Sequence, residues 1–329
     1  MKYSSKILFM TIILSSTTLV LMSNTWLSMW MGLEMNLMAF IPFMSETKNF
    51  YSSEGCMIYF LTQALGSSLF LMAIMFNSSY MLMYMESSFI MMVSMLIKMG
   101  AAPFHLWLPI MVEKLNWTKC LMLLTWQKIA PLHIISNMSL NYNSMSLFIM
   151  MSAIIGSVGG LNQSSLRKIM AYSSINHLGW MLSCILMENN MWMIYLLIYS
   201  TTVMLMMILF KKMSTYMISQ ITSNSSLTMK INMTMLFMSL GGLPPFLGFM
   251  PKWMVIQYLM KLNLHLMTMV MIMSSLLTLF FYLRIITPMM LNNSIKNKWD
   301  ITLNMSMIMT NSMMIITNLM MPVMYILNI

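Results

Sequence analysis

Four titratable side chains lie within long apolar stretches of this sequence and are suited to proton chemistry. They are Glu34 in MWMGLEMNLM, Lys98 in MLIKMGAAPFHLW, Lys128 in TWQKIAPLH and Lys252 in LPPFLGFMPKW. A lysine at the centre of a bilayer costs roughly 2.5–3.5 kcal/mol on insertion scales. Such a group must face the protein interior, pair with an acid or lose its proton. The sequence therefore predicts a relay of exchangeable protons through these four positions.

Glu34 is the one acid predicted to lie in the middle of a membrane span, so we expect it to be the counter-ion of Lys98. Lys128 and Lys252 have no such acid in this chain. For each lysine an alternative stays open, in which its ammonium only hydrogen-bonds the carbonyls of a broken helix. Histidine is the usual side chain for proton exchange near neutral pH. Three histidines are candidate relays, with a purely packed role open for each: His105, His133 and His177.

The composition decides which class of protein must hold these residues. Of the 329 residues, 59% are hydrophobic and 7% are charged, whereas soluble domains are about one quarter charged. We expect an all-α, polytopic membrane protein that forms a single membrane domain over residues 1–329. The net charge of +10 reflects the loops of such a protein, and we expect no nucleic-acid partner. The 55 methionines are scattered without metal-ligand spacing and stand in for Leu and Ile.

A transmembrane helix needs about 20 apolar residues, and the sequence holds about eleven such segments. The first is expected to be retained rather than cleaved. The predicted spans are 7–23, 25–44, 57–77, 87–110, 119–140, 144–160, 170–187, 191–212, 231–260, 265–288 and 305–327.

Basic residues are strongly concentrated in the loops on one side of these spans. The side opposite the N-terminus has Lys261 alone. The positive-inside rule then places the N-terminus in the compartment where the chain is made, and the C-terminus across the membrane. The N-terminal side has Lys2, Lys6, Lys48, Lys114, Lys119, Arg167, Lys168, Lys211, Lys212, Lys230, Lys296 and Lys298.

The fourth and ninth spans carry residues that break helices. If the last span is set aside, ten remain, and the broken one is fourth in each set of five. Because five is odd, the sets run oppositely, as in inverted repeats with discontinuous helices at matching positions. The sequence thus predicts one repeat over 7–140, a second over 144–288, and a loop with the last helix over 289–329. The alternative is that Gly and Pro are merely commoner in membrane helices. The predicted breaks lie at Gly100, Pro103, Gly241, Gly242, Pro244 and Pro245.

The sequence gives no reason to expect a cofactor or a metal in this chain. It has no GxGxxG motif and no P-loop, and no predicted helix carries two histidines. Cys56, Cys120 and Cys184 lie far apart without CxxC spacing, so they indicate neither zinc nor a disulfide framework. The residues favour transport of protons or ions over transfer of electrons.

Several long motifs now occur in an order that matches one known family. They are MWMGLEMN, IKMGAAPFHLW, LTWQKIAPL, GGLNQSSLRKIMAYSSINHLGWM and MSLGGLPPFLGFMPKW. On these residues the chain closely resembles the NADH dehydrogenase (ubiquinone) subunit 2 family of mitochondrial respiratory complex I, in its short, insect-like animal form. The resemblance runs from about residue 20 to residue 288, and it is weak in loops 213–230 and 289–304 and in the last helix.

The resemblance implies a proton-translocating, antiporter-like core subunit of NADH:ubiquinone oxidoreductase. In that family the residues matching Glu34, Lys98, Lys128 and Lys252 form an ion pair and a central relay. NADH, FMN, iron–sulfur clusters and ubiquinone are bound by other subunits of the enzyme. The implied location is the mitochondrial inner membrane, with the N-terminus in the matrix and the C-terminus in the intermembrane space. The implied partners are other complex I subunits, especially subunits four and four-L, and lipids such as cardiolipin.

Two rival functions remain at this point. The first is a structural membrane-arm subunit without its own proton path. The second is a free-standing cation/proton antiporter, which the single mid-span carboxylate disfavours because sodium sites use several oxygen ligands.

Overall fold

The structure is a computed structural model that describes residues 3–45, 50–79, 84–139, 142–187, 191–223 and 227–291. In these ranges the chain is helical, and the only strand-like pairing in them is an isolated bridge between Ser165 and Met217. The chain divides into two compact units. Unit 1 comprises residues 1–152 and 185–189, and unit 2 comprises residues 153–184 and 190–329.

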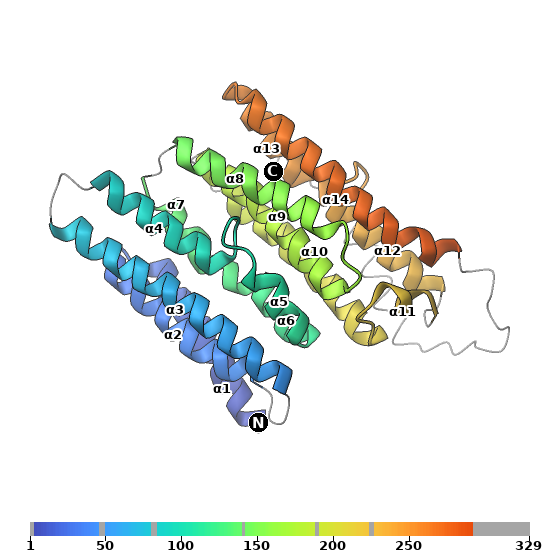
Figure 1. The fold of residues 1–329 in the computed structure, drawn as a ribbon, viewed down its shortest axis with the longest axis horizontal. Helices are drawn as coiled ribbons and strands as arrows, with labels where there is room; N and C mark the ends of the chain where they lie inside the picture. Colours follow the sequence, from blue (N-terminus) through green and yellow to red (C-terminus); the bar gives the residue numbers. More distant parts are fainter. Residues whose placement is uncertain are drawn as a thin grey trace. The chain divides into compact units, whose positions relative to one another are not determined.

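Unit 1 is a bundle in which α3 is the central helix. It packs against α2, α4 and α5, while α1 packs against α2, and α7 contacts both α1 and α4. These helices run alongside one another (Figure 1). Their bounds are α1 Tyr3–Met22, α2 Trp26–Met44, α3 Phe50–Ser79, α4 Tyr84–Met99, α5 Trp107–Lys114, α6 Trp117–Leu124, the 3₁₀ helix η2 Trp126–Lys128 and α7 Ile129–Ser136, and α8 Tyr142–Gly160 begins in this unit.

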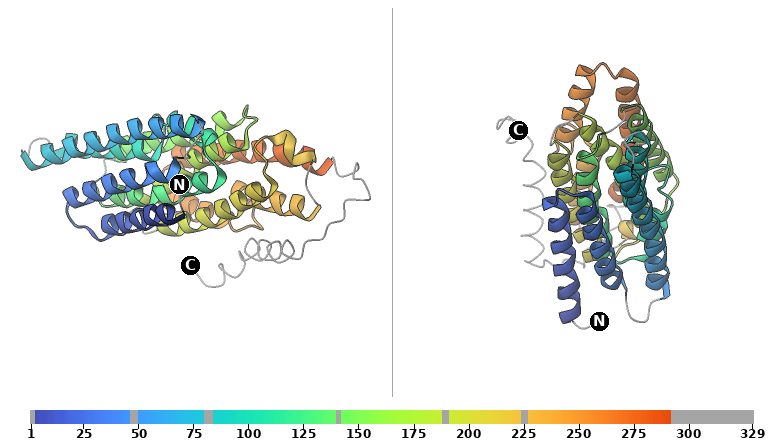
Figure 2. Two further views of the ribbon diagram at one scale, coloured as in Figure 1. Left: turned by 90° about the horizontal axis from the view of Figure 1, so that it is seen from below. Right: turned by 90° about the vertical axis from the view of Figure 1, so that its left-hand side faces the viewer.

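Unit 2 is arranged around α12, which packs against α10 and α14, and α13 also contacts both of these helices. The long α14, coloured red-orange, can be followed in Figure 2. The bounds are α9 Leu166–Leu186, α10 Met191–Met213, α11 Ile218–Ser223, α12 Leu227–Gly241, α13 Phe249–Lys261 and α14 His265–Leu291.

Six helices in the described part of the chain are long and apolar enough to cross a membrane, which is fewer than the eleven predicted spans. The difference has a physical cause. Spans 87–110, 119–140 and 231–260 are each divided into shorter helices, and α9 carries polar and basic residues along its length. The predicted span 305–327 lies outside the described residues. The six are Ser5–Met22, Trp26–Met44, Phe50–Asn77, Tyr142–Gly160, Met191–Met213 and His265–Leu291.

The fourth predicted span is divided where α4 ends at Met99. Gly100 follows with φ +71°, a conformation that side chains with a Cβ rarely adopt. Its N–H donates to Ile97 O at 3.2 Å, and Ala101 N–H donates to Leu96 O at 3.0 Å. This pair of bonds is the Schellman arrangement that closes a helix C-terminus. The chain then turns through Pro103 before α5 begins at Trp107.

The ninth predicted span is divided by the same arrangement. After α12 ends at Gly241, Gly242 has φ +78° and its N–H donates to Ser239 O at 3.0 Å, while Leu243 N–H donates to Met238 O at 3.3 Å. The segment through Pro244 and Pro245 leads into α13. A methyl group at Gly248 would overlap Ser239 O, so the start of α13 packs directly on the backbone of α12.

A further interruption, which the sequence analysis did not predict, lies inside the span 119–140. There α6 ends at Leu124, η2 covers Trp126–Lys128, and α7 follows. Pro131 supplies the reason, because a proline has no N–H to donate and its ring clashes with the carbonyl four residues earlier, here that of Gln127. Lys128 therefore lies in a 3₁₀ turn rather than in the middle of a continuous helix.

Three basic residues from the predicted loops and helix ends hold helix termini in place. Lys119 Nζ donates to Met44 O, the last residue of α2, and Lys114 forms an ion pair with Glu54 of α3. In unit 2, Arg284 donates to Leu161 O and, at 2.7 Å, to Gln163 O, just beyond the end of α8. Each supplies donors to carbonyls or an acid near a helix end, where backbone groups lack helical partners.

Candidate functional site

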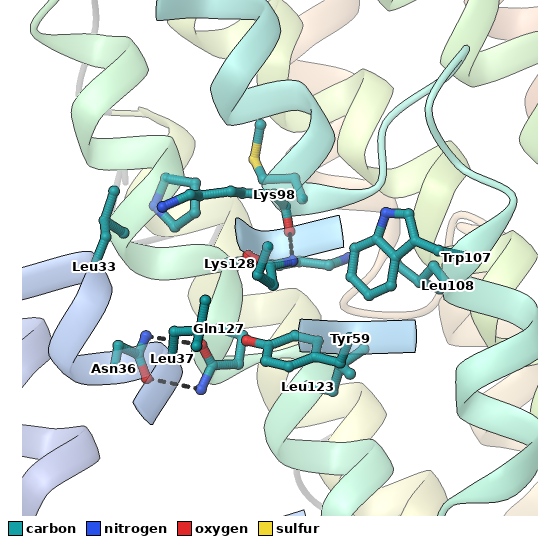
Figure 3. A pocket seen from close by; sticks show the side chains of 13 residues that line it. Leu33, Asn36, Leu37, Tyr59, Lys98, Trp107, Leu108, Leu123, Gln127 and Lys128 are labelled. Atoms are coloured by element: carbon teal, nitrogen blue, oxygen red, sulfur yellow. Dashed lines mark hydrogen bonds between the residues drawn. The ribbon is translucent and has the colours of Figure 1, made fainter. Parts of the chain in front are cut away.

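A pocket in unit 1 brings Lys98 and Lys128 to one place (Figure 3). The space open to the centre of a water molecule measures about 20 Å³, and one ordered water needs roughly 10–15 Å³ of such space. The pocket thus has room for water between polar side chains. It is lined by Leu33, Asn36, Leu37, Tyr59, Gln63, Lys98, Met99, Trp107, Leu108, Leu123, Gln127, Lys128 and Pro131.

Lys98 lies in the last turn of α4, with only 7% of its surface exposed. Gln63 Nε2 of α3 donates to Lys98 O at 3.0 Å, and Trp107 Nε1 donates to Ile97 O at 3.1 Å. These donors satisfy carbonyls at the end of α4. A methyl group at Gly66 would lie 2.8 Å from Lys98 Cγ, so the lysine stem packs closely on α3.

Glu34, the predicted counter-ion, is half-buried on α2 and does not line the pocket. Among the described residues no direct ion pair joins its carboxylate to Lys98. The polar residue of α2 that lines the pocket is Asn36 instead, beside Leu33 and Leu37. Direct or water-bridged pairing of Glu34 with Lys98 remains a prediction.

Lys128 is 2% exposed and ends η2. The residue before it, Gln127, exchanges two hydrogen bonds with Asn36: Asn36 Nδ2 donates to Gln127 Oε1 at 2.8 Å, and Gln127 Nε2 donates to Asn36 Oδ1 at 3.0 Å. Figure 3 shows the two amides facing each other beside Lys128. Sequence analysis did not single out this pair, because its members are 91 residues apart.

Lys252 occupies the helix break of unit 2 and is 5% exposed. Its Nζ donates to Leu240 O at 3.2 Å and to Gly241 O at 2.9 Å, the last carbonyls of α12. The ring of Trp180 lies 6.0 Å from the same nitrogen, about the limit of a cation–π contact. The lysine reaches back from α13 to cap the helix that precedes the break.

The three candidate histidines lie in different surroundings. His105 is part of the turn between α4 and α5, where Nδ1 is 3.2 Å from Pro103 O, and it does not line the pocket. His133, in α7, is half-buried, with Nε2 3.2 Å from Asn137 Nδ2. His177 is buried in α9.

His177 belongs to a polar cluster in unit 2 that the sequence analysis missed. Its Nδ1 lies 2.9 Å from Tyr195 Oη, and its ring centroid lies 4.9 Å from that of Tyr199. Nearby in sequence, Asn176 Oδ1 accepts from Ser274 Oγ at 3.4 Å. Polar side chains are rare in membrane helices and often mark functional sites. The polar run SSINH, residues 173–177, could therefore have indicated this cluster from the sequence.

The described residues hold no group of three or more His, Cys, Asp or Glu side chains that could bind a metal ion. What they do hold is a set of buried lysines beside carbonyls, amides and a space of water size. A lysine ammonium offers three donors and can release one proton when its surroundings change. The arrangement is therefore suited to passing protons between nearby groups.

The sequence is similar to that of a known family of membrane proteins over most of its length. Residues 23–278 match the family described as NADH:quinone oxidoreductase/Mrp antiporter, TM. NADH-ubiquinone oxidoreductase chain 2 of Anopheles gambiae is 42% identical over 307 residues, covering 91% of this chain and 90% of the relative. The protein of the same name from Locusta migratoria is 40% identical over 309 residues, covering 92% and 90%.

Two solved structures share the fold at low sequence identity. A chain of respiratory complex I from Thermus thermophilus has a TM-score of 0.81 at 20% identity, covering 87% of this chain and 70% of the other. A chain of the Mrp complex from Dietzia sp. has a TM-score of 0.75 at 16% identity, covering 85% and 59%. With the long match to the family and 42% identity across most of its length, this multi-pass membrane protein belongs to the NADH-ubiquinone oxidoreductase chain 2 family, within the NADH:quinone oxidoreductase/Mrp antiporter group.

Proposed function

We propose that this chain is a proton-translocating, antiporter-like core subunit of NADH:ubiquinone oxidoreductase, complex I. NADH oxidation and ubiquinone reduction take place in other subunits, and this chain moves protons across the membrane in response. The observation that carries the proposal is the pocket of unit 1, where Lys98 and Lys128 line one space with room for water. Buried lysines are costly in a membrane protein, and a transport role accounts for their placement.

Lys98 and Lys128 exchange protons through the pocket on this account, with Glu34 modulating the charge of Lys98. Lys252 acts in unit 2, where three carbonyl or ring contacts hold its ammonium. His177 with Tyr195 is a candidate relay, and His133 is a weaker one because it is half-buried. His105 has the least support, since it lies in a turn outside the pocket.

The proposed topology has eleven transmembrane segments. The pairs α4–α5, α6–α7 and α12–α13 each cross the membrane as a broken helix, and α9 crosses as a polar helix. The eleventh predicted span, 305–327, lies outside the described residues. Irregular backbone at membrane depth is tolerated where protein or water satisfies it. We propose residues 7–140 and 144–288 as inverted repeats. The bias of basic loops supports a location in the mitochondrial inner membrane, with the N-terminus in the matrix and the C-terminus in the intermembrane space.

The proposed partners are other complex I subunits, especially the neighbouring subunits four and four-L, and lipids such as cardiolipin. NADH, FMN, iron–sulfur clusters and ubiquinone are assigned to those other subunits. The support for this assignment is the family to which the chain belongs and a sequence without nucleotide-binding motifs.

A structural role is the second candidate, and one observation favours it. Lys252 caps the carbonyls of α12, which stabilises a helix end whether or not a proton moves. Assembly and transport therefore have to be measured separately.

The change Lys128→Met tests the proposal, because it keeps the bulk of the side chain and removes the titratable group. Blue-native electrophoresis first establishes that the variant chain is in the complex, and also excludes a free-standing antiporter. The assembled complex should then oxidise NADH roughly a hundredfold or more slowly, which is the lower end for loss of a proton-transfer group. Wild-type oxidation with an unchanged number of protons moved per electron, in a fully assembled variant, would contradict the proposal and favour the structural role.

A further inference from the structure

The reciprocal amide pair between Asn36 and Gln127 lies on the wall of the pocket that Lys98 and Lys128 share. It links α2 to η2 across 91 residues of sequence. Each amide uses one donor and its carbonyl oxygen in the pair, at 2.8 and 3.0 Å. Such a two-bond contact fixes both distance and orientation, as a single bond would not.

Stability alone gives a poor account of these two residues. A buried amide must be hydrogen-bonded to offset the cost of leaving water. Replacing both members of such a pair by apolar residues of similar shape is often nearly neutral. Leucine at both positions would therefore serve the stability of this apolar bundle about as well. Two amides that face each other there point to a positioning role instead.

The backbone at Gln127 explains what has to be positioned. Pro131 interrupts the helical ladder, and η2 is a single 3₁₀ turn between α6 and α7. A turn of this kind holds its neighbours less firmly than an α-helix does. The side chain of Gln127, adjacent to Lys128, is anchored to the continuous helix α2 through Asn36.

The neutrality of the pair also matters. A carboxylate at either position would lie on the same pocket wall as two lysines and would favour their charged forms. Amides offer donors and acceptors to water without fixing a proton on either lysine.

We propose that Asn36 and Gln127 are positioning residues for proton transfer: their reciprocal amide pair holds η2, and with it Lys128, against the pocket that Lys98 shares. The proposal rests on the proposed function, because it assigns a role within the same proton path. The pair acts through Lys128 and does not itself gain or lose a proton.

The test compares variants of the assembled complex in membrane vesicles. Asn36→Leu and Gln127→Leu each break the pair. The double change Asn36→Gln with Gln127→Asn exchanges the two amides and keeps the combined length of the two side chains. Gln163→Leu is the matched control: Gln163 Nε2 donates to Gly159 O at the end of α8, and Gln163 does not line the pocket. We expect each single leucine variant to assemble and to lose roughly tenfold or more in NADH oxidation, as misplacement of a reacting group does.

The double exchange should recover most of that loss, and Gln163→Leu should match the wild type. A merely structural contact would change the amount of complex and leave its turnover unaltered. If the leucine variants do not assemble, the shape-preserving changes Asn36→Asp and Gln127→Glu test the proposal instead. We expect both variants to assemble and to oxidise NADH slowly.

The outcomes separate the two proposals. Slow Lys128→Met with wild-type turnover in the pair variants would overturn the positioning role and leave the proposed function standing. A double exchange as slow as the single variants would overturn it as well, and so would wild-type turnover in Asn36→Asp and Gln127→Glu. Wild-type turnover with an unchanged number of protons moved per electron in Lys128→Met would overturn the proposed function, and the positioning role with it.

Discussion

The buried lysines are satisfied in different ways, which distinguishes their roles at the scale of single residues. Lys252 gives its ammonium to two carbonyls of α12, whereas Lys98 and Lys128 line a space of water size. Removing a buried partner leaves the other group unsatisfied, at a cost of roughly 1–3 kcal/mol. Lys252 therefore has a structural role at the end of α12 besides the transport role proposed for it.

Gly242 provides a test of the break that Lys252 caps. A methyl group there would lie 2.9 Å from Lys252 Cδ, in a backbone with φ +78°. Gly242→Ala should cost about 1–2 kcal/mol from the left-handed conformation alone, and displacement of Lys252 adds to this. The matched control is Gly241→Ala, whose methyl group would meet its nearest neighbour at 3.6 Å.

The thermal stability of the complex, followed as loss of the assembled band on heating, measures this difference. We expect a lower transition temperature for Gly242→Ala and no decrease for Gly241→Ala, since alanine is favoured over glycine within a helix. Equal stability of the two variants would show that the positive φ at Gly242 is not required.

At the scale of elements, the sequence predicts a feature well when the residues that cause the feature are close together in the chain. Gly100 and Gly242 end α4 and α12 because of their own backbone conformations, so a glycine–proline pattern indicates the place. Near η2 the sequence offers only Pro131 as a signal of a break, and membrane helices often tolerate a single proline, as α2 does at Pro42. The amide pair of Asn36 and Gln127 joins distant helices, and no spacing in the sequence could reveal it.

The predicted counter-ion of Lys98 shows the same limit. Glu34 follows from elimination, as the one acid predicted within a span, and its pairing with Lys98 stays a prediction. Its side chain direction on α2 could not be derived, and the structure places Asn36 rather than Glu34 on the pocket wall.

Pro131 supports a prediction at this scale. Pro131→Ala restores an N–H and removes the clash with Gln127 O, so α6, η2 and α7 can join into one helix. We expect the complex to be at least as stable as the wild type and to oxidise NADH several-fold more slowly, because Lys128 would turn away from its place beside the pocket.

The control for this change is Pro109→Ala in α5, a buried proline that does not line the pocket. NADH oxidation per assembled complex compares the two variants. Undiminished oxidation by Pro131→Ala would show that the 3₁₀ turn is not needed for turnover.

At the scale of the whole molecule, each unit contains its own helix break closed in the same way. In both, a proline follows three residues after the left-handed glycine: Pro103 after Gly100, and Pro245 after Gly242. The lysines are not equivalent in this register. Lys98 precedes its glycine by two positions and Lys252 follows its glycine by ten, so the proposed repeats share the break and differ in how a lysine reaches it.

The number of protons moved per electron tests the central claim most directly. It is measured in sealed vesicles with assembled complexes carrying Lys128→Met, and with Lys119→Met as the control. Lys119 is another buried lysine, but it caps Met44 O and does not line the pocket. The account predicts that Lys128→Met lowers the ratio or nearly stops turnover, while Lys119→Met lowers stability and leaves the ratio unchanged. An unchanged ratio with normal turnover in Lys128→Met would contradict proton transfer through this pocket.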